Sequence, residues 1–174
     1  ADIDNDGWTD IISLDMLPED LIAYKTSGRE YNNQIYNEYL KNGYRPQFMQ
    51  NTLLRNNRGD YFQEMAFASG IAASDWSWSP LIVDLDNDGY KDLYVSNYVY
   101  WSEKNNPKCF NASSKQDYCG PGSFKGQKDS FYINEKGKKL IEKTDQYFPS
   151  MPELPGLNVI CNDINHDGYA DFIV

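Results

Sequence analysis

The sequence predicts an all-β protein, and two repeated patterns lead to this prediction. A nine-residue Asp-rich turn flanked by apolar, β-branched residues occurs three times, and a β-hairpin pattern occurs twice in step with it. Both patterns recur at intervals of about eighty residues, a period that two unrelated motifs do not share by chance. We therefore expect one β unit to be repeated within the 174 residues of the chain.

The Asp-rich turns come first in each unit, at residues 2–10, 84–92 and 163–171. Apolar residues on both sides of the second turn predict two strands that the turn joins. The hairpin patterns at 51–65 and 129–143 supply a third and a fourth strand. Four short antiparallel strands per unit is the make-up of one blade of a β-propeller, and this is the fold that we expect.

The repeat divides the chain into three expected parts. Residues 1–78 form a partial first blade, residues 79–156 a second blade, and residues 157–174 the start of a third. The first part begins inside its Asp-rich turn and the third ends in its second strand. We therefore expect two to three blades of a longer propeller, with neighbouring blades of the same chain as partners.

An insertion follows the second strand of each of the first two units, so both insertions should emerge on the same rim. Residues 17–50 predict a helical insertion because four apolar residues have helical spacing. These residues are Tyr31, Ile35, Tyr39 and Leu40. Rim insertions are where repeat proteins usually carry binding surfaces.

The second insertion, residues 101–128, contains several Pro and Gly residues, which predict an ordered but irregular loop. Cys109 and Cys119 bracket its polar centre. A disulfide between them is one interpretation, and it requires an oxidising compartment; two free thiols is the other. Cys161 has no evident partner, and its redox state is left open by the sequence.

Composition limits the possible partners. The net charge of −10 and the pI of about 4.5 disfavour nucleic acid and anionic membrane surfaces, because both are negatively charged. Aromatic residues make up 15% of the chain, too many for a disordered segment. No apolar run approaches the roughly 18–20 residues of a membrane helix, so we expect no membrane span in this segment.

The acidic residues predict metal binding. The chain has 18 Asp but only 8 Glu, and 11 of the Asp residues lie in the three turns. Carboxylates at alternate positions of one tight turn offer the hard oxygen ligands that Ca²⁺ prefers, and the following Gly allows the sharp bend. An EF-hand is excluded because position twelve is never Glu and the flanks are strand-like.

We expect up to three Ca²⁺ ions, with a backbone carbonyl at position seven and an Asp at position nine completing each set. The turn at 84–92 is the most secure site, and the turn at 163–171 is the weakest because Asn165 replaces an acid there. The expected ligands are Asp2, Asp4, Asp6, Trp8 and Asp10; Asp84, Asp86, Asp88, Tyr90 and Asp92; and Asp163, Asn165, Asp167, Tyr169 and Asp171.

Trp76 and Trp78 alternate with Ser on a predicted strand, so both should face the same side. They are a possible ligand surface, because exposed tryptophans stack on sugar rings. Packing between neighbouring blades is the alternative, and such a pair adopts it more often.

We expect no catalytic residues. The single His166 occupies a variable position of the third turn, and no nucleophile motif or phosphate loop is present. A pair of acids for sugar hydrolysis would have to come from isolated residues such as Glu64, Asp75 or Glu103, and nothing in the sequence singles these out.

The Asp-rich turns, with Asn51-x-Leu53-x-x-Asn56 and the Asp75–Pro80 segment, resemble FG-GAP/VCBS repeats, the calcium-loop blades of integrin-α-like β-propellers. The chain is most similar to secreted bacterial VCBS-repeat proteins of the cartilage acidic protein 1 / ASPIC-UnbV group, through residues 15–20 and 118–121. Asp129 departs from the usual hairpin Asn. The resemblance implies an extracellular propeller with seven or a similar number of blades.

The expected function is a calcium-binding, rigid scaffold that binds a protein or glycan at the cell surface. The expected location is secreted, periplasmic or on the cell surface. Two alternatives stay open: a propeller-based polysaccharide lyase or hydrolase that uses calcium, and a structural subunit of a larger surface complex.

Overall fold

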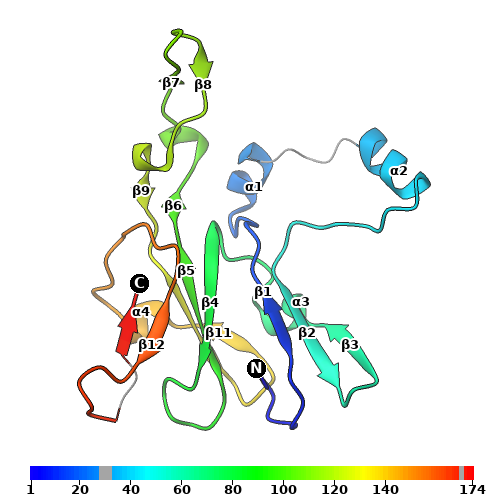
Figure 1. Cartoon of the computed structure of the whole chain (residues 1–174), viewed down its shortest axis with the longest axis vertical. Coiled ribbons are helices and arrows are strands. Elements are labelled where there is room, and N and C mark those ends of the chain that lie inside the picture. The colour runs from blue at the N-terminus through cyan, green and yellow to red at the C-terminus, as the bar shows by residue number, and fades with distance from the viewer. Residues whose placement is uncertain (28–32, 169–170) are drawn as a thin grey trace.

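The computed structural model describes residues 1–27, 33–168 and 171–174 (Figure 1). The chain is mostly β, with a few short helices, so the prediction of a β fold is confirmed. Three antiparallel sheets follow one another along the sequence, and two smaller strand pairs belong to an insertion. The predicted positions Tyr31 and Tyr169 lie outside the described residues.

The first sheet has three strands in the order β1-β2-β3. Its strands are β1 (Ile11–Ser13), β2 (Thr52–Asn57) and β3 (Tyr61–Glu64). The hairpin between β2 and β3 turns through Arg58 and Gly59, whose φ angles are 56° and 84°. Two successive residues in this left-handed region match the right-handed twist of the flanking strands, so the turn closes a tight hairpin.

The second sheet has four strands in the order β11-β10-β5-β4. Its strands are β4 (Ser77–Val83), β5 (Asp92–Asn97), β10 (Ser130–Asn134) and β11 (Leu140–Glu142). The hairpin between β10 and β11 repeats the left-handed turn, with φ of 52° at Lys136 and 75° at Gly137. The third sheet contains the strands β12 (Ile160–Asn162) and β13 (Asp171–Ile173).

One short helix follows each hairpin, namely α3 (Ala66–Ser69) and α4 (Thr144–Tyr147). Both begin in the same way. The Glu64 carboxylate accepts a hydrogen bond from the Ala66 amide, and the Glu142 carboxylate accepts one from the Thr144 amide, each at 2.9 Å. Each Glu therefore satisfies an amide that the helix itself leaves unpaired.

The first insertion carries two helices, α1 (Leu21–Ser27) and α2 (Asn33–Lys41). The predicted helical spacing therefore corresponds to α2, although α2 buries none of its side chains. No helix in the described part of the chain is long and apolar enough to cross a bilayer.

The second insertion is more regular than the sequence indicates. A disulfide joins Cys109 to Cys119, which agrees with the first of the two interpretations. The expectation of an irregular loop was wrong in part, because backbone pairing on both sides of the disulfide forms two short ladders. The elements are β6 (Val99–Tyr100) with β9 (Lys125–Gly126), β7 (Cys109–Phe110) with β8 (Gln116–Asp117), and the 3-10 turns η1 (Glu103–Asn105) and η2 (Pro121–Ser123).

The two ends of the sheets carry different features. The Asp-rich turns lie at the lower end in Figure 1, whereas both insertions extend from the upper end. Helix α1 contacts η1, so the insertions touch each other. Asp75 also joins them: its carboxylate accepts hydrogen bonds from the Glu19 amide at 2.9 Å and from Gln127 Nε2 at 2.6 Å.

Two apolar clusters hold the three sheets together, and β5 contributes to both. Leu93 and Val95 belong to a cluster shared with the first sheet, whereas Tyr94 belongs to a cluster shared with β13, where its ring stacks on Phe172. Successive side chains of a strand point to opposite faces. The second sheet therefore buries one face against each neighbour, and every residue of β5 is buried.

Candidate metal centre

The three Asp-rich turns, here called the first (2–10), second (84–92) and third (163–171) Asp loops, have the same left-handed backbone at positions four and six. Position four is left-handed in each, with φ of 57° at Asn5, 59° at Asn87 and 61° at His166. Position six is a Gly with φ between 89° and 94°. Asn and His tolerate the left-handed region better than most residues, so His166 has a conformational role in its loop.

The first residue of each loop closes the turn through its own backbone. The carboxylates of Asp2, Asp84 and Asp163 accept a hydrogen bond from the Gly amide five residues later, at 2.9, 3.0 and 3.0 Å. The Asp at position one of each loop thus stabilises the turn and is also an expected metal ligand. The tight turn brings the carboxylates at alternate positions close together.

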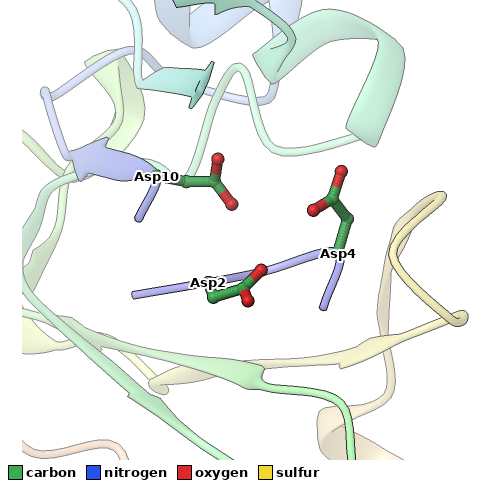
Figure 2. Close-up of side chains that lie close together, drawn as sticks. All are labelled: Asp2, Asp4 and Asp10. Carbon is green, nitrogen blue, oxygen red and sulfur yellow. The ribbon is translucent and has the colours of Figure 1, made fainter. Parts of the chain in front are cut away.

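In the first Asp loop, Asp2, Asp4 and Asp10 each place one carboxylate oxygen within 4.8 Å of the others. Figure 2 shows the three side chains around a common space. Asp6 is not in this group, and its carboxylate instead accepts a hydrogen bond from the Trp8 amide at 2.9 Å. The Trp8 ring packs over Gly59, where a Cβ atom would lie 3.0 Å from it.

In the second Asp loop, the group consists of Asp84, Asp86 and Asp88, again with oxygens within 4.8 Å of one another. Asp84 Oδ1 is buried and has no hydrogen-bond partner within the described part of the chain. A buried carboxylate oxygen without a donor carries a large desolvation cost, which a bound cation would remove. The Tyr90 amide donates to Asp88 at 2.8 Å, as its counterpart does in the first loop.

The Asp at position nine joins each of the first two loops to the hairpin of its own repeat. Asp10 accepts hydrogen bonds from the amides of Ile3 and Asn56, both at 2.8 Å. Asp92 accepts them from the amides of Leu85 and Asn134, both at 2.9 Å. Burial raises the pKa of Asp92 above its ordinary value, and the two amide hydrogen bonds oppose that shift.

The third Asp loop differs in its contacts. Asn165 Nδ2 donates a hydrogen bond to Asp167 Oδ2 at 3.0 Å, so one oxygen of this carboxylate is already paired within the loop. Asp171 accepts a hydrogen bond from the Ile164 amide at 2.9 Å, as position nine does in the other loops. Among the described residues, this loop does not bring three carboxylates together as the other two do.

The first Asp loop also has a cationic neighbour. Arg55 Nε, from β2, lies 2.5 Å from Asp4 Oδ2, in an ion pair whose atoms are not aligned as a hydrogen bond. Burial raises the pKa of Asp4, the positive charge of Arg55 opposes this shift, and the neighbouring carboxylates of Asp6 and Asp10 reinforce it.

The first Asp loop packs directly on the second repeat. Asn5 Nδ2 donates to the Gly89 carbonyl of the second loop at 2.8 Å, and Asn134 Nδ2 donates to the Ile3 carbonyl at 2.8 Å. A Cβ atom on Gly137 would lie only 2.6 Å from Asp4 Cα. The two loops and the second hairpin therefore form one continuous junction.

The candidates Asp75, Trp76 and Trp78 lie at or just before the start of β4, at the opposite end of the second sheet, whereas Glu64 ends β3 of the first sheet. Trp76 stacks on Trp101, with ring centroids 6.5 Å apart, and Trp78 is 54% exposed beside Tyr98. Of the isolated acids, Asp75 is engaged by both insertions and Glu64 caps α3. The structure does not place these residues near the Asp loops.

Three contributors to the site were not assigned a role from the sequence. Asn56 and Asn134 each accept a hydrogen bond from the hairpin Gly amide at 2.8 Å and donate to a backbone carbonyl of the Asp loop. Their recurrence at the same place in both hairpins was the available signal. The role of Arg55 was not evident from the sequence, because the matching position of the second hairpin is Ile133 and the repeat therefore does not conserve a cation there.

Repeated antiparallel sheets, each connected to an Asp-rich turn, define a β-repeat protein. A family model for the FG-GAP-like repeat matches residues 2–95, more than half of the chain, and the chain belongs to this family. Neither a curated protein nor a solved structure matches the chain. Family membership suggests an extracellular scaffold of the β-propeller type, a class whose repeats often mediate protein interactions.

Proposed function

We propose that this chain is a calcium-binding segment of an extracellular β-propeller that acts as a rigid scaffold. The observation that carries the proposal is the convergence of three carboxylates in each of the first two Asp loops, within 4.8 Å. Carboxylates held this close repel one another, and a cation bound between them would remove that repulsion.

The residues present fit Ca²⁺. Every side-chain donor in the two groups is a carboxylate oxygen, the hard ligand that Ca²⁺ selects, and no thiol or imidazole belongs to either group. Asp2, Asp4 and Asp10 would hold the first ion, and Asp84, Asp86 and Asp88 the second. The third Asp loop would bind more weakly, because the Asn165 amide occupies Asp167.

The bound ions would stabilise the junctions between repeats and leave the opposite end of the sheets for partner binding. At that end the two insertions contact each other and share the Asp75 carboxylate. They present exposed apolar side chains. We propose a protein or glycan at the cell surface as the partner, a secreted, periplasmic or cell-surface location, and membership of the cartilage acidic protein 1 / ASPIC-UnbV group.

The proposed role is non-enzymatic. It is supported by the structural use of the isolated acids: Asp75 accepts two hydrogen bonds from the insertions, and Glu64 accepts one from the Ala66 amide. A carboxylate that already accepts structural hydrogen bonds is poorly placed to act as an acid or base on a sugar.

Calcium titration with thermal melting tests the metal role. We expect Ca²⁺ in excess of EDTA to raise the melting temperature strongly and Mg²⁺ to raise it less, because a ligand that binds only the folded state stabilises it by about 2.7 kcal/mol at a hundred times its Kd. Asp84→Asn should remove part of this gain, whereas Asp117→Asn, an exposed acid in β8, should leave it intact. Equal melts with EDTA and with Ca²⁺ would refute the proposal.

A further inference from the structure

The ion pair between Arg55 and Asp4 distinguishes the first Asp loop from the second. Arg55 extends from β2 to the loop, and its Nε lies 2.5 Å from Asp4 Oδ2. The Asp4 side chain is only 10% exposed, whereas the Arg55 side chain is 46% exposed. The carboxylate is therefore held in the loop, and the guanidinium reaches it from a position that still has access to solvent.

Among the described residues, the second Asp loop has no equivalent pair. Arg55 directly precedes Asn56 in the first hairpin, and Ile133 directly precedes Asn134 in the second. The two Asn residues make the same hydrogen bonds to the loop and to the hairpin Gly, so the preceding positions correspond. A neutral side chain thus stands in the second repeat at the place where the first has a cation.

We propose that Arg55 is an internal counter-ion that sets the first Asp loop to a lower Ca²⁺ affinity than the second. This inference rests on the proposed calcium binding. Asp4 is one of the three carboxylates that converge in the first loop, so an incoming ion either competes with the guanidinium for Asp4 or lies close to its positive charge. Both effects weaken binding, because like charges repel strongly at a partly buried site.

The same ion pair would also lower the electrostatic cost of the first loop when no metal is bound. Arg55 neutralises one of the three clustered carboxylates, which reduces the repulsion among them. The partial exposure of Arg55 allows it to move into solvent when an ion arrives. The second loop has no such substitute, so it depends more on the ion and fills at the lower Ca²⁺ concentration.

Two further cations lie near this loop and must be separated from Arg55. Lys138 and Lys139, in the turn between β10 and β11, line a small cavity of about 30 Å³ together with Asp4, Asp10 and Arg55. Neither Lys forms an ion pair with these acids in the described structure, in contrast to Arg55. A Lys138 variant therefore measures the general effect of removing a nearby positive charge.

Terbium luminescence can report on the first loop selectively. Tb³⁺ replaces Ca²⁺ at oxygen sites, and the loops differ in the aromatic residue at position seven, which is Trp8 in the first but Tyr90 and Tyr169 in the others. Excitation at the red edge of the tryptophan band, where tyrosine does not absorb, sensitises Tb³⁺ close to Trp8. Displacement by Ca²⁺ then gives the affinity of the first loop. Tryptophan also absorbs where tyrosine does, so the second loop is followed by tyrosine excitation in a Trp8→Phe background, which removes the donor of the first loop.

We expect Arg55→Gln to raise the Ca²⁺ affinity of the first loop on the order of tenfold, through loss of one nearby charge. Arg55→Lys should change it much less, and Lys138→Gln should give only a small part of the increase. The affinity of the second loop should be the same in all three variants. In the unchanged protein, the second loop should fill before the first.

Three results would overturn the inference. Tb³⁺ and Ca²⁺ binding at the first loop with the same affinity in Arg55→Gln as in the unchanged protein would reject the role of Arg55 while leaving calcium binding intact. Absence of Ca²⁺ displacement at every loop would reject the proposed function and the inference together. A rise in affinity that Lys138→Gln reproduces in full would assign the effect to overall charge and also reject a specific role for Arg55.

Discussion

The first and second repeats use the same hydrogen bonds but differ in how deeply these are buried. In both, the Asp at position nine accepts the amide of a hairpin Asn, and that Asn accepts the amide of the hairpin Gly. In the second repeat, Asn134 is almost fully buried and also donates to the Ile3 carbonyl of the first repeat. In the first repeat, these hydrogen bonds connect residues of that repeat only. In the second repeat, they also connect it to the first.

The comparison also explains the departure of Asp129 from the expected Asn. Asn51 and Asp129 occupy the same position, and each accepts a backbone amide at 2.7 Å, from Asp15 and from Asn97 respectively. The Asn51 amide group donates to the Ile71 carbonyl, whereas the second Asp129 oxygen accepts the Tyr94 hydroxyl at 2.8 Å. A donor partner requires an acceptor, so a carboxylate replaces the amide.

Both differences have one cause. The second sheet packs against a sheet on each face, while the first sheet packs against a neighbour on one face only within the described structure. Residues at matching positions of the two repeats therefore contribute differently to the free energy of unfolding. Substituting both members of a matching pair measures how large this difference is.

The largest difference is expected between Leu93→Ala and Ile11→Ala. These residues follow position nine in their repeats, but Leu93 is fully buried and Ile11 is 47% exposed. We expect Leu93→Ala to lower the free energy of unfolding by about 3 kcal/mol, since it leaves a cavity, and Ile11→Ala by about 0.5 kcal/mol. Urea denaturation in saturating Ca²⁺ measures both, and equal losses would contradict the difference in packing.

The hairpin glycines provide a second pair. Both have positive φ, but a Cβ on Gly137 would lie 2.6 Å from the Asp4 backbone, whereas a Cβ on Gly59 would meet only the Trp8 ring. We expect Gly137→Ala to cost about 2 kcal/mol and Gly59→Ala about 1 kcal/mol. Gly137→Ala should also weaken Ca²⁺ binding at the first loop. If the two variants unfold at the same urea concentration, the close contact between repeats is not important for stability.

The smallest effect is expected at the boundary between the repeats. Glu19 accepts a hydrogen bond from the Tyr132 hydroxyl at 3.3 Å. Burial, and then the charges of Asp75 and Glu142, raise its pKa above 4.5. The folded state therefore binds the proton more tightly than the unfolded state, so ionised Glu19 lowers stability as pH rises through its folded pKa.

Glu19→Gln removes this charge and keeps an acceptor for Tyr132. We expect a small gain in stability at neutral pH that disappears below pH 4.5, where Glu19 is protonated in both states. Thermal melts across this pH range test the prediction, with Glu153→Gln at an exposed position as the control. A gain that persists in acid would show that charge is not its origin.

The parts of the fold that sequence predicted well are local. The Asp loops and the hairpin turns depend on Asp, Asn and Gly at fixed short spacings, which determine a turn without reference to the rest of the chain. The cross-linking of Cys109 to Cys119 is similarly local. The ladders of the second insertion were not predicted, because strands of two residues carry no periodicity.

The parts of the site that sequence did not predict depend on contacts between distant segments. Arg55 meets Asp4 only because β2 pairs with β1, the strand that follows the first Asp loop. Asn134 reaches Ile3 across 131 residues. No spacing rule relates such positions, since their proximity is a product of how the sheets pack.

The alternation of faces along β5 bears on how such a chain can change over generations. Leu93 and Val95 contact the preceding repeat, whereas Tyr94 contacts the following one. A repeat that is duplicated or exchanged by recombination must therefore match two different neighbours, each through its own set of alternate residues. Neighbouring positions of β5 would therefore evolve independently of each other. Each position would instead co-vary with the residue that it contacts in its own neighbouring repeat.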